Sequence, residues 1–422
     1  MEARSTPATL PRRLPRSSRP IGLGLVLLCL AGTLIIGFAA KAPCASGDWS
    51  DGRQYRLLCY TDIIPLLTTE QLAGGRLPFL DACTPVPDTR CDEYPVLTMY
   101  LMRVAGWISD TNYRGFFAAN VTLLWLCAVV VAVSLYAMVG ARALYLALAP
   151  TLLVYGTVNW DLFAVAFATA ALLAFFGRRD ILAGVLLGLG GSAKFYPLML
   201  ALPLIAQRLQ DREPDGAIRL GWATAGSWVA VNIPFMIAAP SAWLTFFRFN
   251  SERCADFDSL WAIGWRHLHS GGGSACSETA TINLASFGAF VLVIGAAWGA
   301  RRHRYPDFSR WTLVFPLVAA FLLTSKVYSP QYGLWLLPLF ALALPSLRGF
   351  VAFSLADLSV FVTRFWWFGH LDGLTGVEQW MFELAVVVRA AVLVACLVVW
   401  ILRAPEMLPA TPASAHREPE PA

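Results

Sequence analysis

Long runs of apolar residues recur along almost the whole chain, and they constrain its fold more than any other feature. Residues 21–40 and 116–139 are two such runs, and neither contains a charged residue. A helix needs about 20 apolar residues to cross a hydrocarbon core of roughly 30 Å. In a chain of 422 residues that is 57% hydrophobic and only 14% charged, these runs predict an all-α fold, a polytopic transmembrane helical bundle.

The positions of arginine predict which loops face the cytoplasm. Arginines gather before the first apolar run and in the short breaks between later runs, at residues 12–19, 178–179, 208–219, 301–310, 348 and 403. The positive-inside rule places these segments in the cytoplasm, so the net charge of +5 needs no nucleic-acid partner. Alternating spans then give about 12 crossings with both termini cytoplasmic, if residues 181–209 form a hairpin of two short helices that turns near Lys194.

The chain divides into three parts by composition. Residues 1–20 and 404–422 are rich in Arg, Pro, Ser or Ala, which predicts disordered cytoplasmic tails, and 21–403 form one polytopic domain in the plasma membrane. Two long loops, about 41–113 and 241–281, carry more acidic than basic residues and are predicted to lie outside the cell. In the first loop we expect an interfacial helix that ends at Gly74-Gly75, and a second interfacial or re-entrant helix over 94–109.

Six of the nine cysteines lie in the two predicted outer loops. The first loop holds four and the second holds two, namely Cys44, Cys59, Cys83, Cys91, Cys254 and Cys276. Even numbers of cysteine on an oxidising side of the membrane indicate disulfides, and the spacing favours Cys83–Cys91 and Cys254–Cys276. Free thiols are the alternative.

Several ionisable and amide side chains interrupt the apolar pattern where a membrane protein normally avoids them. Such groups persist when they pack against partners or face a wet cavity, so they are candidates for a functional site. The candidates, with the aromatic residues that accompany them, are Asp62, Glu93, Tyr94, Asn159, Asp161, Lys194, Tyr196, Lys326, Tyr328, Gln331 and Tyr332. The predicted topology places all of them at the outer ends of spans or in the first outer loop. No zinc or phosphate-loop motif occurs, so we predict no metal site.

Lysine is rare in this chain, and two of its three lysines share a sequence context. Of 32 basic residues only Lys41, Lys194 and Lys326 are lysine, and both Lys194 and Lys326 are followed closely by Tyr and Pro. A compact ammonium suits a phosphate, and a helix broken by proline frees backbone groups that can face a cavity. The alternative is a lysine that snorkels and marks a helix end.

Each candidate carboxylate also has a purely structural interpretation. Asp62 stands before a helical pattern with Pro65 in its first turn, so it could be a helix N-cap. Asp161 could cap the following apolar helix, and Glu93 could simply begin the next interfacial helix. A capping carboxylate is still an oriented acceptor, so capping and catalysis are compatible for Asp62.

These motifs occur in a fixed order that resembles a known family. The segments are YTDIIPL, DEYPVLTMYLM, NWDLFAVAF, AGVLLGLGGSAKFYPLMLALPL and SKVYSPQYGLWLLPL, within about residues 55–345. In this order, and with this topology, the chain resembles the polytopic mannosyltransferases of glycosyltransferase family 87 in the GT-C superfamily. It departs from them at 82–91, ACTPVPDTRC, which lengthens the loop before Glu93 and leaves the acceptor unassigned.

The resemblance implies an enzyme that transfers a hexose, mannose in the family, from a polyprenyl-phosphate donor. The acceptor would be a hydroxyl of a cell-envelope glycolipid or glycan, on the extracytoplasmic face, with inversion at the anomeric carbon and no further cofactor. The resemblance places the general base at Asp62, while Lys194 and Lys326 would bind the donor phosphate. The other candidates would contact substrate, and the membrane lipid would hold the donor tail.

Two other functions fit parts of the sequence. A flippase or transporter for a lipid-linked sugar could use the same lysines, but it would need charges at mid-membrane and on both faces, whereas these gather on one. A non-catalytic scaffold for envelope assembly would have no need of Asp62.

Overall fold

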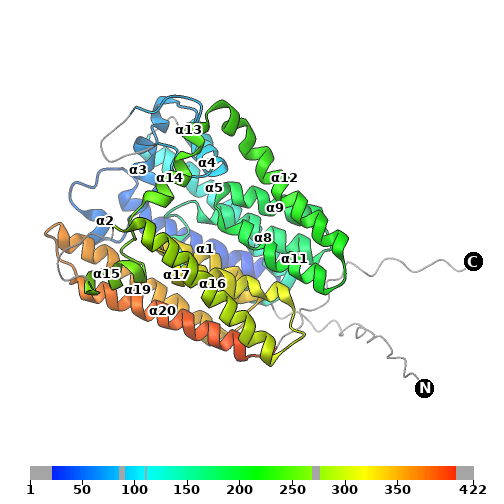
Figure 1. Cartoon of the computed structure of the whole chain (residues 1–422). Helices are drawn as coiled ribbons and strands as arrows, with labels where there is room; N and C mark the ends of the chain where they lie inside the picture. The colour runs from blue at the N-terminus through cyan, green and yellow to red at the C-terminus, as the bar shows by residue number, and fades with distance from the viewer. Residues whose placement is uncertain (1–20, 85–90, 110–111, 269–275, 405–422) are drawn as a thin grey trace, which may run out of the picture.

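The computed structural model describes residues 21–84, 91–109, 112–268 and 276–404, and within them every regular element is helical. The helices run mostly side by side in one bundle, and the short helices α2, α3, α13, α14 and α15 lie towards one end of it (Figure 1). The predicted all-α bundle is therefore confirmed. The predicted tails, 1–20 and 405–422, lie outside the described residues.

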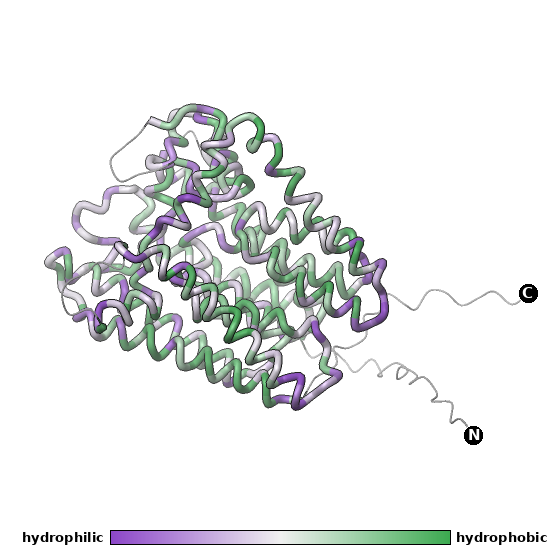
Figure 2. Tube along the Cα trace, in the orientation of Figure 1, coloured by the Kyte–Doolittle hydropathy of each residue, from purple (hydrophilic) through white to green (hydrophobic). Residues whose placement is uncertain are grey.

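Among the described residues, six helices are long and apolar enough to cross a membrane. They are α1 (Leu23–Lys41), α5 (Tyr113–Val139), α12 (Pro214–Ala238), α16 (Thr279–Arg304), α19 (Leu347–Leu371) and α20 (Gln379–Leu402). Large apolar side chains on them point outward: Trp222 is 75% exposed and Leu292 is 73% exposed. Hydrophobic residues run along the middles of the helices, and hydrophilic ones gather near their ends (Figure 2). An apolar outer surface of this kind is what lipid contact requires.

Shorter apolar helices complete the bundle. They are α4 (Val96–Ile108), α8 (Asp161–Phe176), α9 (Asp180–Ala193) and α17 (Val314–Thr324), the last continuing the 3-10 turn η4 (Arg310–Leu313). None reaches the length of a full span by itself, so the predicted count of about 12 crossings stays a prediction.

The stretch 181–209 folds as the predicted hairpin. Helix α9 ends at Lys194, whose backbone is extended, and the chain returns through α10 (Tyr196–Met199) and α11 (Ala201–Gln210). At the far ends of the two arms Arg208 Nε donates to Asp180 Oδ1 at 2.7 Å. The chain therefore reverses at Lys194, as the basic residues at both ends of the stretch predicted.

Glycine lets α9 and α12 approach closely. Gly184 and Gly188 lie one turn apart on α9, and a Cβ atom at Gly188 would lie 2.4 Å from the carbonyl oxygen of Thr224 on α12. A Cβ at Gly184 would lie 2.5 Å from the carbonyl oxygen of Leu220. This is the small-xxx-small packing of membrane helices, and it fixes the position of the hairpin that carries Lys194.

The remaining helices are short and connect the long ones. They are η1 (Ala42–Cys44), α2 (Arg53–Arg56), α3 (Ile63–Thr69), η2 (Leu72–Gly74), η3 (Gly140–Ala143), α6 (Leu144–Ala147), α7 (Pro150–Tyr155), α13 (Pro240–Trp243), α14 (Thr245–Glu252), α15 (Leu260–Leu268), η5 (Pro330–Leu336) and α18 (Leu337–Leu342). The interfacial helix expected to end at Gly74-Gly75 is shorter than predicted. It ends at Thr69, because Gln71 has a left-handed backbone with φ of 52°.

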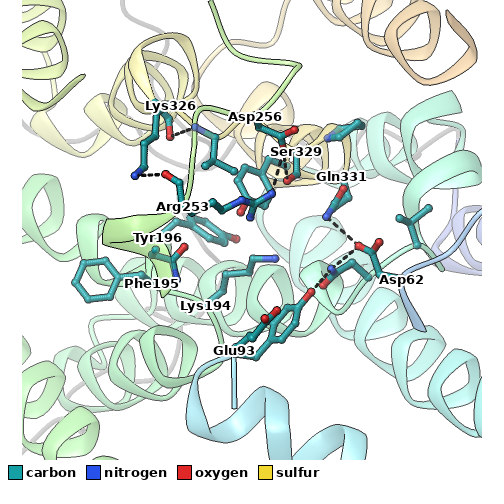
Figure 3. A pocket seen from close by; sticks show the side chains of 18 of the residues that line it. Asp62, Glu93, Lys194, Phe195, Tyr196, Arg253, Asp256, Lys326, Ser329 and Gln331 are labelled. Carbon is teal, nitrogen blue, oxygen red and sulfur yellow. Dashed lines mark hydrogen bonds and ion pairs between the residues drawn. The ribbon is translucent and has the colours of Figure 1, made fainter. Parts of the chain in front are cut away.

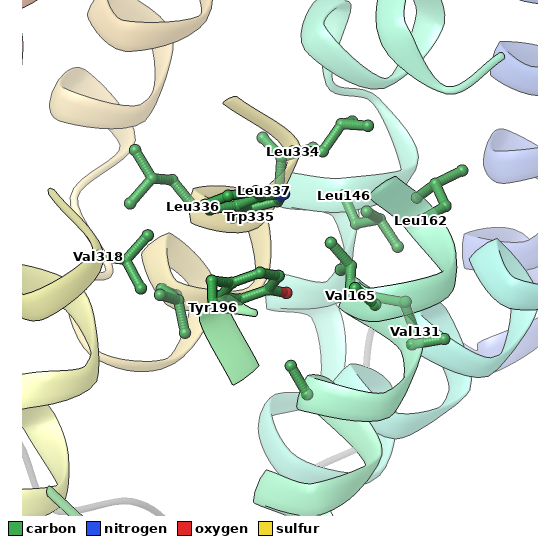
Figure 4. Packing of buried hydrophobic residues seen from close by; sticks show 14 of the residues in the cluster. Val131, Leu146, Leu162, Val165, Tyr196, Val318, Leu334, Trp335, Leu336 and Leu337 are labelled. Atoms are coloured by element: carbon green, nitrogen blue, oxygen red, sulfur yellow. The ribbon is translucent and has the colours of Figure 1, made fainter. Parts of the chain in front are cut away.

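A stack of three aromatic rings anchors the core beside the hairpin. The ring of Trp335 lies between those of Tyr196 and Tyr332, with 4.2 Å between centroids on each side. Around Tyr196 and Trp335, apolar residues of α5, α6, α8, α17 and η5 close the core (Figure 4). The α9–α10 turn and η5 are thereby fixed against each other although they lie far apart in the sequence.

Three disulfides fasten the loops. They join Cys44 to Cys59, Cys83 to Cys91 and Cys254 to Cys276. Both pairs that the spacing favoured are present, and the remaining two loop cysteines pair with each other. The cysteines of the long apolar helices, Cys29, Cys127 and Cys396, are free.

Candidate active site

A cavity of about 820 Å³ lies where the loops meet the helix ends. Nine of the eleven residues predicted for the site line it, namely Asp62, Glu93, Tyr94, Asn159, Lys194, Tyr196, Lys326, Gln331 and Tyr332. In Figure 3 the ammonium of Lys194 points towards the side of the cavity where Asp62 lies, and Lys326 lies on the opposite side. Residues far apart in the sequence therefore share one cavity.

The carboxylate of Asp62 is held by three donors. The Tyr60 hydroxyl donates to Oδ1 at 2.8 Å, and Asn159 Nδ2 and Gln331 Nε2 donate to Oδ2 at 2.8 and 3.5 Å. The Asp62 backbone N–H donates to the carbonyl oxygen of Val158 at 2.9 Å, which ties the loop to the start of α8. The carboxylate is oriented on both oxygens, and Oδ1 keeps a lone pair that can accept a further proton or hydrogen bond.

Asp62 stands at the N-cap position of α3, yet its side chain makes no capping bond. Thr61 supplies that bond instead, since its Oγ1 accepts from the Ile63 N–H at 3.2 Å. The Asp62 carboxylate therefore takes no part in capping the helix and faces the cavity. Burial raises the pKa of the Asp62 carboxyl above its usual value, and the hydrogen bonds from Asn159 and Tyr60 and the positive charge of Lys194 oppose that rise.

The third lysine braces the loop that leads to Asp62. Lys41 ends α1 and is 2% exposed, and its ammonium donates to the carbonyl oxygens of Tyr60 at 2.8 Å and Leu58 at 3.2 Å. The Cys44–Cys59 disulfide closes the same loop onto the end of α1. Together they fix Tyr60, whose hydroxyl orients the Asp62 carboxylate.

Asp161 does not line the cavity, and the prediction that it contacts substrate is corrected. Its side chain is fully buried behind the wall, where Lys194 Nζ donates to Oδ2 at 3.0 Å and Trp335 Nε1 donates to Oδ1 at 2.6 Å. It is also no N-cap, because Trp160 holds that position of α8. Asp161 therefore fixes Lys194, whose ammonium also lies 4.9 Å from the ring centroid of Tyr332.

Tyr328 is the second residue that the structure moves out of the site. Its side chain turns away from the cavity into the core, where the guanidinium of Arg389 lies 3.6 Å from its ring centroid. Its neighbours Val327 and Ser329 line the cavity, whereas the Tyr328 side chain is buried against Arg389.

Lys326 reaches the cavity from the side opposite Asp62. Its ammonium donates to the carbonyl oxygens of Arg253 at 2.6 Å and Ser251 at 3.1 Å, at the end of α14. Carbonyl oxygens do not neutralise an ammonium, so its charge remains. The C-terminal end of a helix carries negative partial charge, so Lys326 stabilises the end of α14 and is also a cation of the cavity.

Sequence reasoning missed a group of charged residues in the cavity wall. Arg253 pairs with Asp256 at 3.1 Å, and Arg364 of α19 contacts Asp256 at 3.5 Å and also pairs with the buried Asp258. Arg364 interrupts an apolar helix, and that signal could have revealed it from the sequence. Arg253 and Asp256 lie in a polar loop, where no such signal exists.

The site offers no visible metal centre. Among the residues that the structure describes, no group of three or more His, Cys, Asp and Glu side chains is placed to hold a metal ion. The cavity cations Lys194 and Lys326 contact a carboxylate and backbone carbonyls, and neutral side chains hold the Asp62 carboxylate. The prediction that no metal is needed stays a prediction.

Comparisons with known proteins address the family. The model of glycosyltransferase family 87 matches residues 93–330, a range that includes Lys194 and Lys326 and begins after Asp62. No curated protein matches the chain. Two solved structures are similar to it, ArnT from Cupriavidus metallidurans bound to undecaprenyl phosphate and the same protein in the apo state, each at 15% identity and a TM-score of 0.45.

Each similarity to ArnT extends over 90% of this chain and over 77% and 76% of the two ArnT chains. The match to the family rests on the amino-acid sequence, whereas the similarity to ArnT rests on the fold. Since the family match spans residues 93–330, more than half of the 422 residues, the chain belongs to glycosyltransferase family 87.

Proposed function

We propose that this membrane glycosyltransferase moves a hexose from a polyprenyl-phosphate donor to an acceptor hydroxyl, with Asp62 as general base. The observation that carries the proposal is that the Asp62 carboxylate and the ammonium groups of Lys194 and Lys326 line one cavity. A base and cations in one cavity suit a reaction that takes up a proton at one point and develops phosphate charge at another.

The proposed reaction is a single displacement. The acceptor oxygen attacks the anomeric carbon, the bond from that carbon to the phosphate oxygen breaks, and the hydroxyl proton passes to Asp62. Polyprenyl phosphate leaves with the bonding electron pair, and the configuration at the anomeric carbon is inverted. Asp62 serves this step because its carboxylate is oriented by Tyr60 and Asn159.

An apolar wall suits the lipid tail of the donor. Phenylalanines of α14, α16 and α17 line the cavity on the side of Lys326, namely Phe246, Phe249, Phe287, Phe290 and Phe321. Phe287 is 66% exposed, so this wall continues onto the outer surface of α16. A polyprenyl chain could lie there while its phosphate and sugar reach the polar part of the cavity.

The finer parts of the proposal come from the resemblance and the predicted topology. Mannose is the proposed hexose, and a cell-envelope glycolipid or glycan is the proposed acceptor. The arginine pattern supports a site on the extracytoplasmic face of the plasma membrane with both termini in the cytoplasm.

One assay distinguishes transfer from its rivals. The purified protein in liposomes receives polyprenyl-phosphate-mannose and candidate acceptors, and both covalent transfer and lipid translocation are measured. We expect covalent transfer. Translocation of the intact donor without transfer would favour a flippase, and neither activity with any acceptor would favour a scaffold.

The pH dependence of transfer tests the base. Because burial raises the pKa of Asp62 above its ordinary value of 3.8, and only the carboxylate accepts a proton, we expect kcat/KM to fall as pH drops through that raised value. Tyr60→Phe removes a bond that stabilises the carboxylate, so it should move this acidic limb to higher pH. A limb that does not move in Tyr60→Phe would contradict the assignment.

Lys326 is expected to support donor binding. Lys326→Met removes a cation from the cavity and should raise KM for the polyprenyl-phosphate donor about tenfold or more, as loss of a charged hydrogen bond of about 1.5–3 kcal/mol implies. Arg248→Met is the matched control, because Arg248 is an exposed cation of α14 that does not line the cavity. Steady-state kinetics with varied donor measure both, and an unchanged donor KM in Lys326→Met would remove Lys326 from this role.

A further inference from the structure

A buried carboxylate outside the cavity holds the loop that carries part of the site. Glu70 follows α3, and its side chain is 0% exposed. Its Oε2 accepts from the Asp92 N–H at 2.6 Å, and its Oε1 accepts from the Glu93 N–H at 3.3 Å. The two oxygens of the Glu70 side chain thus accept hydrogen bonds from two successive backbone amides, those of Asp92 and Glu93.

A guanidinium completes this cluster. Arg76 makes a two-pronged pair with Asp92, at 2.9 and 3.2 Å, and lies 3.8 Å from the Glu70 carboxylate. Arg76 is 6% exposed and Asp92 is 4% exposed, so the cluster is shielded from solvent. The cluster contains two carboxyl groups, Glu70 and Asp92, and one guanidinium, Arg76. One positive charge therefore faces two acidic groups.

The backbone at Asp92 depends on these bonds. Asp92 has a φ of 63°, a left-handed conformation that costs a non-glycine residue free energy. The Phe79 N–H donates to Asp92 Oδ1 at 3.0 Å, and the Cys83–Cys91 disulfide closes the loop just before it. The cluster therefore holds a conformation that this segment would not adopt by itself.

Tyr94 is linked to Asp62, the proposed base, through the side-chain amide of Asn159. Tyr94 lines the cavity, and its hydroxyl accepts from Asn159 Nδ2 at 2.8 Å. The same Nδ2 donates to Asp62 Oδ2, also at 2.8 Å. The backbone at Asp92 and Glu93 thus fixes the position of the Tyr94 side chain. The Tyr94 hydroxyl in turn fixes the Asn159 amide, which orients the Asp62 carboxylate.

We propose that Glu70 is a positioning residue for Asp62: by holding the amides of Asp92 and Glu93 it places Tyr94, which orients Asn159 on the base. This inference rests on the proposed role of Asp62 in catalysis. It assigns a function to the buried acid in the TTEQ segment, which the sequence analysis did not single out. Glu70 itself does not touch the cavity.

The titration of Glu70 is expected to make the stability of this loop depend on pH. The pKa of the Glu70 carboxyl is raised from 4.5 to about 8, chiefly by burial and also by the carboxylates of Asp92 and Glu93, while the two backbone amides oppose the rise. Arg76, Asp92 and Glu93 are the charged groups that face it. A carboxyl with a raised folded pKa stabilises the fold fully below its unfolded pKa, and this contribution is lost as pH rises through about 8.

Glu70→Gln tests the inference, because glutamine cannot ionise and presents only one acceptor oxygen. Hydrogen exchange in the full-length protein should be about tenfold faster at the amides of 91–94, as loss of one buried hydrogen bond implies. Transfer should show a lower kcat with donor KM changed less than about twofold. Wild type is expected to lose protection above pH 8, after correction for intrinsic exchange, and the variant is expected to show no such loss.

Asp81→Asn is the matched control. Asp81 is an exposed carboxylate of the same loop, and its Oδ2 accepts from the Leu77 N–H at 2.7 Å without contacting residues 92–94. We expect it to leave exchange at 91–94 and kcat unchanged.

The outcomes separate this inference from the proposed function. Unchanged exchange at 91–94 in Glu70→Gln, or faster exchange with an unchanged kcat, would overturn the positioning role even if Asp62 is the base. Should the variant fail to fold, Glu70→Asp, which keeps the carboxyl but shortens its reach, takes its place: unchanged exchange at 91–94 in Glu70→Asp would overturn the inference. Activity retained by Asp62→Asn would instead defeat the proposed function, and it is measured separately.

Discussion

Replacing Asp62 by asparagine is expected to lower kcat for sugar transfer on the order of 10²–10⁴-fold, the usual contribution of a general base. Asparagine has nearly the same shape, and it can still accept from Tyr60 at its remaining oxygen. It cannot take up the acceptor proton. The expected result is therefore a folded protein that binds the donor but scarcely transfers its sugar, measured as product formed per enzyme under saturating substrates.

The matched control for this variant is Asp48→Asn. Asp48 lies in the same loop and accepts hydrogen bonds from Ser50, but it is not among the cavity-lining residues. It should retain wild-type turnover. Near wild-type kcat in Asp62→Asn, with an unchanged thermal midpoint in both variants, would remove Asp62 from the base role.

Breaking the pair between Lys194 and Asp161 should have the second large effect, on stability and on catalysis together. Lys194→Met removes the ion pair of the fully buried Asp161 carboxylate and leaves it the hydrogen bond from Trp335 Nε1. Removal of one member of a buried ion pair costs about 3–5 kcal/mol of unfolding free energy. We also expect kcat/KM for the donor to fall about 10²-fold or more, because a cation positioned near developing phosphate charge is lost.

A double variant separates the two contributions. Lys194→Met combined with Asp161→Asn removes both charges and keeps an oxygen for Trp335 Nε1, so most of the lost stability should return. Donor use should not return, because the ammonium is still missing. Unfolding in detergent by denaturant and steady-state kinetics measure the two quantities. Recovery of donor use in the double variant would show that Lys194 acts only on the fold.

Arg208→Met provides a control for simple loss of a buried ion pair. Arg208 and Asp180 form such a pair at 2.7 Å at the far ends of the same hairpin, with side chains 3% and 9% exposed. The variant should lose stability comparably, yet its donor KM at fully folded protein should match wild type. A donor defect as large as that of Lys194→Met would mean that the hairpin, rather than the ammonium, controls donor use.

The sequence predicted the fold class because lipid imposes a simple rule. Each backbone polar group must be satisfied within its own segment, so long apolar runs become helices whatever surrounds them. The same rule made Asp62, Lys194 and Lys326 conspicuous, because charge is costly beside such runs. All three line one cavity. The hairpin at Lys194 followed from the arginines at both its ends.

The partners of these groups could not be predicted, because they come from distant parts of the chain. Asp161 was expected to contact substrate, but Lys194 and Trp335 bind both of its oxygens behind the wall. Tyr328 was expected in the site, but its ring packs in the core against the guanidinium of Arg389 from a distant helix. Arg253 lay unnoticed because a charge in a polar loop carries no signal.

By itself, then, the sequence determined that this chain forms a helical membrane bundle and which scarce charges stand out from it, since both follow from the local cost of placing polar groups near lipid. Only the tertiary structure decided which charge neutralises which, and which side chains face the cavity. Those choices depend on distances of a few ångströms between segments up to hundreds of residues apart, as between Asp62 and Gln331. Local composition does not specify such distances.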